Sequence, residues 1–181
     1  IKALDEHNIL SNIKSVIGTS SGALIAVLCV LDFKYNEIEE IMLKINTSNL
    51  KNISSENIIN FFNDYGLDDG KNFHRIIKII LNIKVKNENI TFKELFELTN
   101  KRLIITATCV NNMNIEYFDH INTPDIPVIT VLLMSISIPI IFKPIKLENK
   151  YYVDGGLISH YPIDFFKDEK DKTLGILVTS S

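Results

Sequence analysis

The hydrophobic positions of this chain follow two patterns, a spacing of three to four residues and short unbroken apolar runs. The spacing is typical of helices that bury one face. We predict helices over residues 1–9, 35–45, 54–64, 71–82 and 91–99. The apolar runs predict strands over residues 13–17, 103–109, 114–119, 150–153 and, near the end of the chain, 173–178. Helices and strands that alternate in this way predict an α/β fold with a central sheet, built from a single domain of 181 residues.

Two further segments are apolar on every side. Residues 21–32 and residues 128–138 contain almost no polar face, which is typical of helices buried inside a domain. Pro127 and Pro139 bracket the second segment, so it is too short for a membrane span of about 20 residues. We therefore expect both segments to be core helices.

Composition limits the classes of function. Hydrophobic residues make up 46% and charged residues 23%, values ordinary for a globular enzyme domain. The net charge of −3 gives no electrostatic reason to expect nucleic acid as a partner, and contact with a membrane would have to rely on apolar insertion. Cys29 and Cys109 lie in apolar stretches and are expected to be core thiols. Because no metal-binding spacing of Cys and His occurs, we expect no metal and no other cofactor.

A serine flanked by glycines carries the strongest chemical signal. Gly18-Thr19-Ser20-Ser21-Gly22 has the pattern G-x-S-x-G and stands between a predicted strand and a predicted helix. This is the context of a nucleophile elbow, a tight turn that exposes the serine hydroxyl. The N–H groups at the start of the following helix favour the negative charge that develops on an attacked carbonyl. Ser20 is therefore the candidate nucleophile.

A serine nucleophile needs a base, and an aspartate is the best candidate. The predicted strand over residues 150–153 runs directly into Asp154-Gly155-Gly156. Asp-Gly is also a common turn dipeptide, but together with the Ser20 motif it favours a catalytic carboxylate. The two residues are 154 − 20 = 134 positions apart, so only the fold can bring them together. His160 remains an alternative base, in a triad with another acid.

Further similarities keep a fixed order along the chain. Helix-like residues 1–10 precede the Ser20 motif, a helix-then-strand segment occupies residues 91–108, and a serine-rich stretch containing Pro139 and Pro144 precedes Asp154. In these features the chain resembles the patatin-like phospholipases, which are lipid acyl hydrolases with a Ser–Asp dyad. The resemblance covers nearly the whole chain.

This resemblance implies a three-layer α/β fold, with a central, mostly parallel sheet flanked by helices. It implies that Ser20 is the nucleophile and Asp154 the base, in motifs that Gly18, Gly155 and Gly156 complete. The implied reaction is phospholipase A-type hydrolysis of fatty-acyl esters, with phospholipid or another lipid ester as substrate. A cytoplasmic enzyme or one attached peripherally to a membrane is expected, and no oligomeric state follows.

The chain departs from the family pattern at the glycine-rich loop that forms the family's oxyanion hole before the first helix. The sequence begins inside that helix at Ile1, so we expect residues 1–181 to be a domain truncated at its N-terminus that hydrolyses lipid poorly by itself. The N–H groups of Ser21 and Gly22 are the remaining candidate oxyanion donors. A second hypothesis stays open, in which this is a catalytically incomplete module that binds lipid or a partner.

Overall fold

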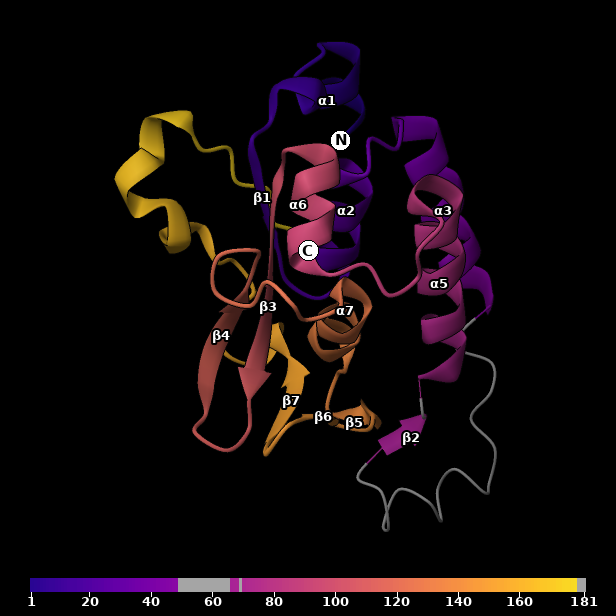
Figure 1. Ribbon diagram of the computed structural model, residues 1–181, viewed down its shortest axis with the longest axis vertical. Coiled ribbons are helices and arrows are strands. Elements are labelled where there is room, and N and C mark those ends of the chain that lie inside the picture. The colour runs from indigo at the N-terminus through magenta and orange to yellow at the C-terminus, as the bar shows by residue number, and fades with distance from the viewer. Residues whose placement is uncertain (49–65, 69, 179–181) are drawn as a thin grey trace.

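The computed structural model describes residues 1–48, 66–68 and 70–178 (Figure 1). Its α-helices are α1 (Lys2–Glu6), α2 (Ser21–Val30), α3 (Tyr35–Ser48), α5 (Lys71–Val85), α6 (Phe92–Thr99) and α7 (Val128–Ile136). Its 3-10 helices are η1 (Leu10–Asn12), η2 (Gly155–Leu157) and η3 (Ile163–Lys172). Its strands are β1 (Ser15–Gly18), β2 (Gly66–Asp68), β3 (Arg102–Cys109), β4 (Asn114–Phe118), β5 (Ile140–Phe142), β6 (Ile145–Leu147) and β7 (Lys150–Asp154). The helix predicted over residues 54–64 lies outside the described residues.

The direction of the strands differs from the expectation. In the main sheet β1 runs parallel to β3, whereas β4 and β7 are antiparallel to β3 and β6 is antiparallel to β7. The expected, mostly parallel sheet is thus corrected to a mixed one for the described strands. The short connections at residues 110–113 and 148–149 account for the β3–β4 and β6–β7 pairs, because such turns join only antiparallel neighbours. β2 and β5 form a separate parallel pair.

β1 and β7 lie end to end along one side of β3. Ile105 pairs with Gly18 of β1 and Ala107 pairs with Asp154 of β7, and both of these β3 residues also pair with β4. Since β4 occupies one side of β3, β1 and β7 must share the other. The two strands approach the middle of β3 from opposite ends, so their last residues, Gly18 and Asp154, arrive close together.

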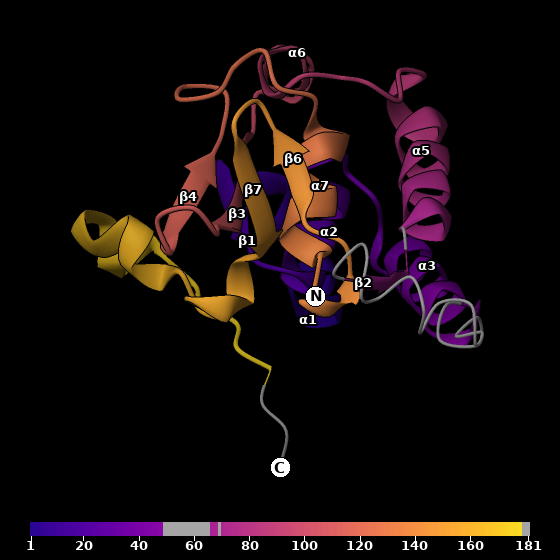
Figure 2. The same ribbon diagram turned by 90° about the horizontal axis from the view of Figure 1, so that it is seen from below.

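Helices cover the sheet in layers, as Figures 1 and 2 show. α2 and α7 pack against the strands, while α3 and α5 lie farther from the sheet than these two helices. The core consists mainly of apolar residues from α2, β3 and α7, with Phe92 and Leu95 added by α6. Both segments that are apolar on every side are therefore core helices, as predicted. The mixed α/β fold with a central sheet flanked by helices is confirmed, and no helix of the described residues is long and apolar enough to cross a membrane.

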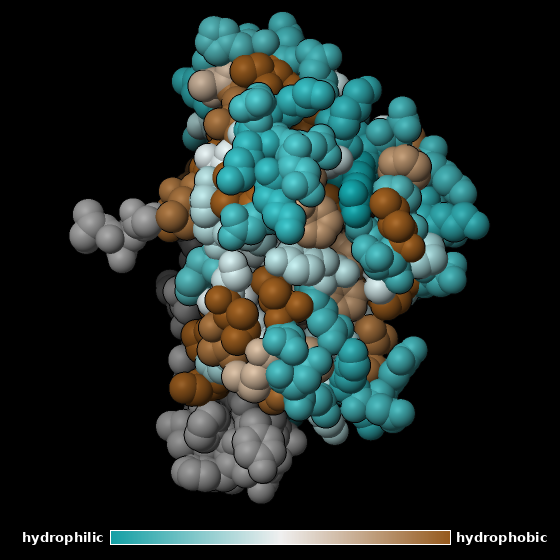
Figure 3. Space-filling model, turned by 90° about the vertical axis from the view of Figure 1, so that its left-hand side faces the viewer, coloured by the Kyte–Doolittle hydropathy of each residue, from teal (hydrophilic) through white to brown (hydrophobic). Residues whose placement is uncertain are grey.

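The helices and strands of the structure can be compared one by one with those predicted from the sequence. The capping box of α6 is confirmed, because Glu94 N–H donates to Thr91 Oγ1 and Thr91 N–H donates to Glu94 Oε2. The first helix is shorter than predicted, and β5, β6 and η3 have no counterpart in the prediction. Residues 173–178 form no strand with the described residues, and this end of the chain projects from the domain (Figure 2). Figure 3 shows apolar residues, in brown, exposed in several places on one face of the molecule.

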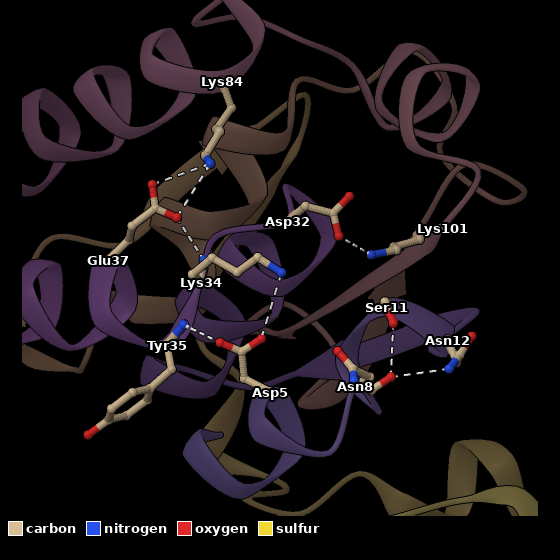
Figure 4. A network of polar contacts seen from close by, with 10 residues as sticks. All are labelled: Asp5, Asn8, Ser11, Asn12, Asp32, Lys34, Tyr35, Glu37, Lys84 and Lys101. Carbon is tan, nitrogen blue, oxygen red and sulfur yellow. Dashed lines mark hydrogen bonds and ion pairs between the residues drawn. The ribbon is translucent and has the colours of Figure 1, made fainter.

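A network of polar contacts joins α1, α3 and α5 (Figure 4). Asp5 of α1 accepts the N–H of Tyr35 at 2.9 Å and lies 3.8 Å from Lys34 Nζ. Glu37 of α3 accepts the N–H of Lys34 at 2.7 Å and lies 3.4 Å from Lys84 Nζ of α5. The charged side chains of these ion pairs are 23% to 72% exposed, so each pair contributes about 0–1 kcal/mol to stability.

Candidate active site

Ser20 occupies a strained turn between β1 and α2. Its φ is 55° and its ψ is −127°, a conformation that costs a residue with a side chain about 1–3 kcal/mol. The turn is so tight that a Cβ on Gly18 would lie 2.3 Å from the carbonyl oxygen of Gly22 and 2.6 Å from Ala23 Cα. A Cβ on Gly22, in contrast, would meet nothing within 4 Å. Of the two glycines that flank Ser20, the turn requires only the first.

The side chains of Ser20 and Asp154 meet. Ser20 Oγ donates a hydrogen bond to Asp154 Oδ2 at 2.6 Å, across a separation of 134 residues. Asp154 is the last residue of β7 and is only 6% exposed. Its other oxygen, Oδ1, accepts the main-chain N–H of Gly156 at 2.6 Å, so both carboxylate oxygens have a partner.

The environment of Asp154 changes its acidity. Burial raises the pKa of the Asp154 carboxyl above its ordinary value, while the hydrogen bonds from Ser20 and Gly156 and the nearby His160 act in the opposite direction. The raised pKa makes the carboxylate a stronger base than that of an exposed aspartate. Proton transfer from a hydroxyl at hydrogen-bond distance is the chemistry to which this arrangement is suited.

The end of α7 contacts both members of this pair. The buried Ser135 Oγ accepts the main-chain N–H of Ser20 at 2.9 Å. The main-chain carbonyl of Ser137 accepts the N–H of Asp154 at 2.9 Å. The Ser137 hydroxyl donates to the Leu133 carbonyl at 2.6 Å. Sequence reasoning noted this serine-rich stretch but gave neither serine a role. The available signal was the presence of two small polar residues at the end of an otherwise apolar helix.

Residues of β3 also contact the chain on either side of the Ser20–Asp154 pair. Thr106 lies between the β3 residues that pair with β1 and with β7, and its Oγ1 shares a hydrogen bond with Thr19 Oγ1 at 2.7 Å. A Cβ on Gly155 would lie 2.5 Å from Thr106 Oγ1 and 2.9 Å from the Thr106 carbonyl oxygen. Glycine at this position therefore lets the chain that follows Asp154 pass directly against β3.

The two candidate oxyanion donors differ in their surroundings. The N–H of Gly22 donates to the Thr19 carbonyl at 2.9 Å, so this group is engaged inside the turn. The N–H of Ser21, at the start of α2, makes no hydrogen bond to any residue in the described part of the chain. Of the two, Ser21 therefore keeps the N–H that a substrate oxygen can reach.

His160 lies beside the pair without joining it. Its ring packs against Gly156, where an added Cβ would lie 2.7 Å from His160 Nδ1. Among the described residues no hydrogen bond connects the histidine to Ser20 or to Asp154. Nor do three His, Cys, Asp or Glu side chains gather into a metal site within residues 1–48, 66–68 and 70–178.

Apolar side chains stand exposed on the chain next to the site. Ile138 follows Ser137, and Leu157 and Ile158 follow the glycines after Asp154; the three are 43%, 51% and 45% exposed. A cavity of about 130 Å³ lies between α5, α7, β5 and β6, with Phe73 among its lining residues, but neither Ser20 nor Asp154 lines it.

Comparison with known sequences identifies relatives over most of the chain. The family model described as patatin-like phospholipase matches residues 1–167. The chain is 34% identical over 169 residues to probable lipid hydrolase 463L of Invertebrate iridescent virus 6, which covers 90% of this chain and 57% of that protein. It is 32% identical over 166 residues to uncharacterized protein R571 of Acanthamoeba polyphaga mimivirus, covering 92% of this chain and 54% of that protein. The chain thus spans little more than half the length of these curated relatives.

A solved structure has the same fold. The crystal structure of VipD from Legionella pneumophila superimposes with a TM-score of 0.58 at 17% identity, over 87% of this chain and 42% of that chain. The family model covers nearly the whole sequence, and a relative above 30% identity covers nine-tenths of it. The chain therefore belongs to the patatin-like phospholipase family.

Proposed function

We propose that this protein is a lipid acyl hydrolase in which Ser20 is the nucleophile and Asp154 is the base. The observation that carries the proposal is the 2.6 Å hydrogen bond from Ser20 Oγ to Asp154 Oδ2, made by the two residues that stand in the G-x-S-x-G and D-G-G motifs. Membership of the patatin-like phospholipase family supports a lipid ester as substrate, and the relative described as a probable lipid hydrolase supports the same class of reaction.

The reaction takes place in two acyl transfers. Asp154 accepts the hydroxyl proton of Ser20 while Ser20 Oγ attacks the ester carbonyl, and Asp154 then passes this proton to the lysophospholipid alcohol as the ester bond breaks. Water then attacks the acyl-serine, Asp154 accepts a proton from this water, and the fatty acid is released while Ser20 regains its hydroxyl proton. The buried carboxylate, with its raised pKa, supplies the basicity that a histidine supplies in a triad.

The negative charge on the attacked carbonyl oxygen needs donors. Ser21 N–H, at the positive end of α2, is the donor that we assign from the described residues. One such donor is typically worth about 10²–10³ in rate. Gly22 has no part in this assignment, since its N–H is engaged with Thr19.

The substrate class implies a lipid surface. Leu157 and Ile158 follow Asp154 closely in sequence, and Ile138 follows Ser137, whose carbonyl accepts the Asp154 N–H. The side chains of all three are exposed, and they suit insertion into a lipid surface, on which a chain with a net charge of −3 would have to rely. We infer that the protein acts peripherally on aggregated lipid, with cleavage of the phospholipase A type. Leu157→Ser should weaken sedimentation with phosphatidylcholine vesicles severalfold, whereas hydrolysis of a short, soluble ester should change by less than twofold.

The direct test is hydrolysis by the full-length protein. Purified wild type, Ser20→Ala and Asp154→Asn are incubated with phosphatidylcholine vesicles, and the released fatty acid and lysophospholipid are measured by mass spectrometry. We expect release by the wild type alone, and we expect it to persist in EDTA because the proposed chemistry uses no metal ion. Vesicle binding without product from any variant would instead support the lipid-binding module.

A further inference from the structure

The turn that carries Ser20 is strained, so something must hold it. Ser20 has a φ of 55° and a ψ of −127°, although it has a side chain. Such conformations persist only where the surrounding contacts over-determine them. The Ser20 carbonyl accepts the N–H of Ala23 at 2.9 Å, which fixes the side of the residue that faces α2. Its N–H points the other way, toward α7.

One side chain accepts a hydrogen bond from the Ser20 N–H. Ser135 Oγ accepts it at 2.9 Å, and Ser135 is fully buried. Two hydrogen bonds thus fix the peptide planes on either side of Ser20, one from α2 and one from α7. The engagement of its N–H with Ser135 also takes this group away from any substrate oxygen, so oxyanion binding is left to the next N–H, that of Ser21.

The C-terminal turn of α7 therefore connects the two halves of the site. Its Ser135 side chain holds the Ser20 main chain, and two residues later its Ser137 carbonyl holds the Asp154 main chain. A helix turn is a stiff unit, so the relative position of Ser20 and Asp154 is set by α7 as well as by their own contact. Of the two links only the Ser135 link depends on a side chain.

We propose that Ser135 is a positioning residue for the nucleophile: its hydroxyl locks the strained Ser20 peptide so that Ser20 Oγ is aimed at Asp154. The proposal rests on the hydrolase function proposed above. Ser135 touches neither substrate nor the reacting atoms, and it acts through the Ser20 main chain alone. Loss of this lock should misplace the hydroxyl by a fraction of an ångström to about 1 Å, a displacement that can cost up to about 100-fold in rate.

The chain offers a matched control. Ser137 stands on the same turn, is nearly as buried, and also loses one hydrogen bond when changed to alanine, but its link to Asp154 uses the main chain and survives the change. In the full-length protein we expect Ser135→Ala to lower kcat 10- to 100-fold with KM within twofold of the wild type. Ser137→Ala should lower kcat clearly less than Ser135→Ala does, and Ser135→Thr, which keeps the hydroxyl, should recover at least part of the loss.

Two readouts separate positioning from a general loss of structure. The pH at which kcat reaches half its maximum should move to higher pH in Ser135→Ala, and more than in Ser137→Ala, because a misplaced Ser20 hydroxyl no longer holds down the pKa of the Asp154 carboxyl. The rate of covalent labelling of Ser20 by a fluorophosphonate should fall by the same factor as kcat. Equal activities of Ser135→Ala and Ser137→Ala would overturn the proposal, and so would a pH midpoint that is the same in Ser135→Ala as in the wild type. An inactive, unlabelled wild type would instead refute the proposed function itself.

Discussion

Two polar regions of this molecule are built in opposite ways. The site around Ser20 and Asp154 uses short hydrogen bonds between buried or half-buried groups, with partners supplied by β3, β7 and α7. The network of α1, α3 and α5 uses charged side chains that are each partly exposed to water. Both regions join elements distant in sequence, and the first includes the strained main chain of Ser20, with a φ of 55° and a ψ of −127°.

This difference indicates where the chain tolerates change. A buried donor or acceptor that loses its partner costs about 1–3 kcal/mol, because water cannot replace the partner. An exposed ion pair that is broken costs about 0–1 kcal/mol, because each charge returns to water. Function and stability should therefore be sensitive around Ser20 and insensitive in the network, and the following predictions test that contrast.

The largest effect is expected from removal of the base. Asp154→Asn keeps the shape of the side chain but cannot accept a proton from Ser20, so kcat should fall about 10²–10⁴-fold. His160→Ala should retain most of the activity, since no hydrogen bond links His160 to either residue in the described structure. Steady-state hydrolysis by the two variants decides, and a severe loss in His160→Ala with a mild one in Asp154→Asn would replace the dyad by a triad.

The two glycines around Ser20 give the largest expected contrast in stability. Gly18→Ala would drive a methyl group into the main chain of Gly22 and Ala23, so it should lower the free energy of unfolding by at least about 1–3 kcal/mol. Gly22→Ala meets nothing and lies in the first turn of α2, where alanine is favoured over glycine by about 0.5–1 kcal/mol. Urea denaturation followed by circular dichroism measures both, and similar losses in the two variants would contradict the tight approach at Gly18.

Asp154 should also leave a signature in the pH dependence of stability. Because its pKa is raised in the folded state, its favourable contribution is complete below the unfolded pKa and is lost as pH rises through the folded pKa. Asp154→Asn should therefore melt at the same or a higher temperature than the wild type at pH 7, with a difference that shrinks in acid. A variant that is less stable at pH 7 and recovers in acid would reverse the sign of the pKa shift.

The smallest effect is expected in the exposed network. Lys34→Ala removes the ion pair with Asp5 but leaves the Lys34 N–H bonded to Glu37, so the free energy of unfolding should change by less than about 1 kcal/mol. Denaturation at low and at high salt checks this value. A loss comparable to that of Gly18→Ala would show that exposed contacts anchor α3 more strongly than their surroundings suggest.

The sequence allowed good predictions where a pattern is local. The apolar character of residues 128–138 and the Thr91–Glu94 capping box each depend on neighbours in sequence, and both are present in the structure. The direction of the strands was not predictable in this way, since β7 could in principle pair with β3 in either direction. The roles of Ser135 and Thr106 were also missed, because a serine at a helix end and a threonine in a strand gain meaning only when Ser20 and Thr19 arrive beside them.

The proximity of Ser20 and Asp154 lies between these cases. Each stood out by its own glycine-flanked motif, so the pair could be named, but the end-to-end arrangement of β1 and β7 along β3 that brings them together could not. This arrangement depends on pairing between distant segments. β1 and β3, for example, are more than 80 residues apart, and no local sequence pattern indicates that they pair.

The most direct test of the account is covalent labelling of the nucleophile. Full-length protein is treated with a fluorophosphonate lipid analogue, digested and analysed by mass spectrometry, with Ser20→Ala, which keeps the neighbouring Ser21, as the matched control. We predict one adduct, on Ser20, that is absent from Ser20→Ala and forms much more slowly in Asp154→Asn because the proton of Ser20 then has no acceptor. An adduct on another serine, or hydrolytically active protein that remains unlabelled at Ser20, would contradict it.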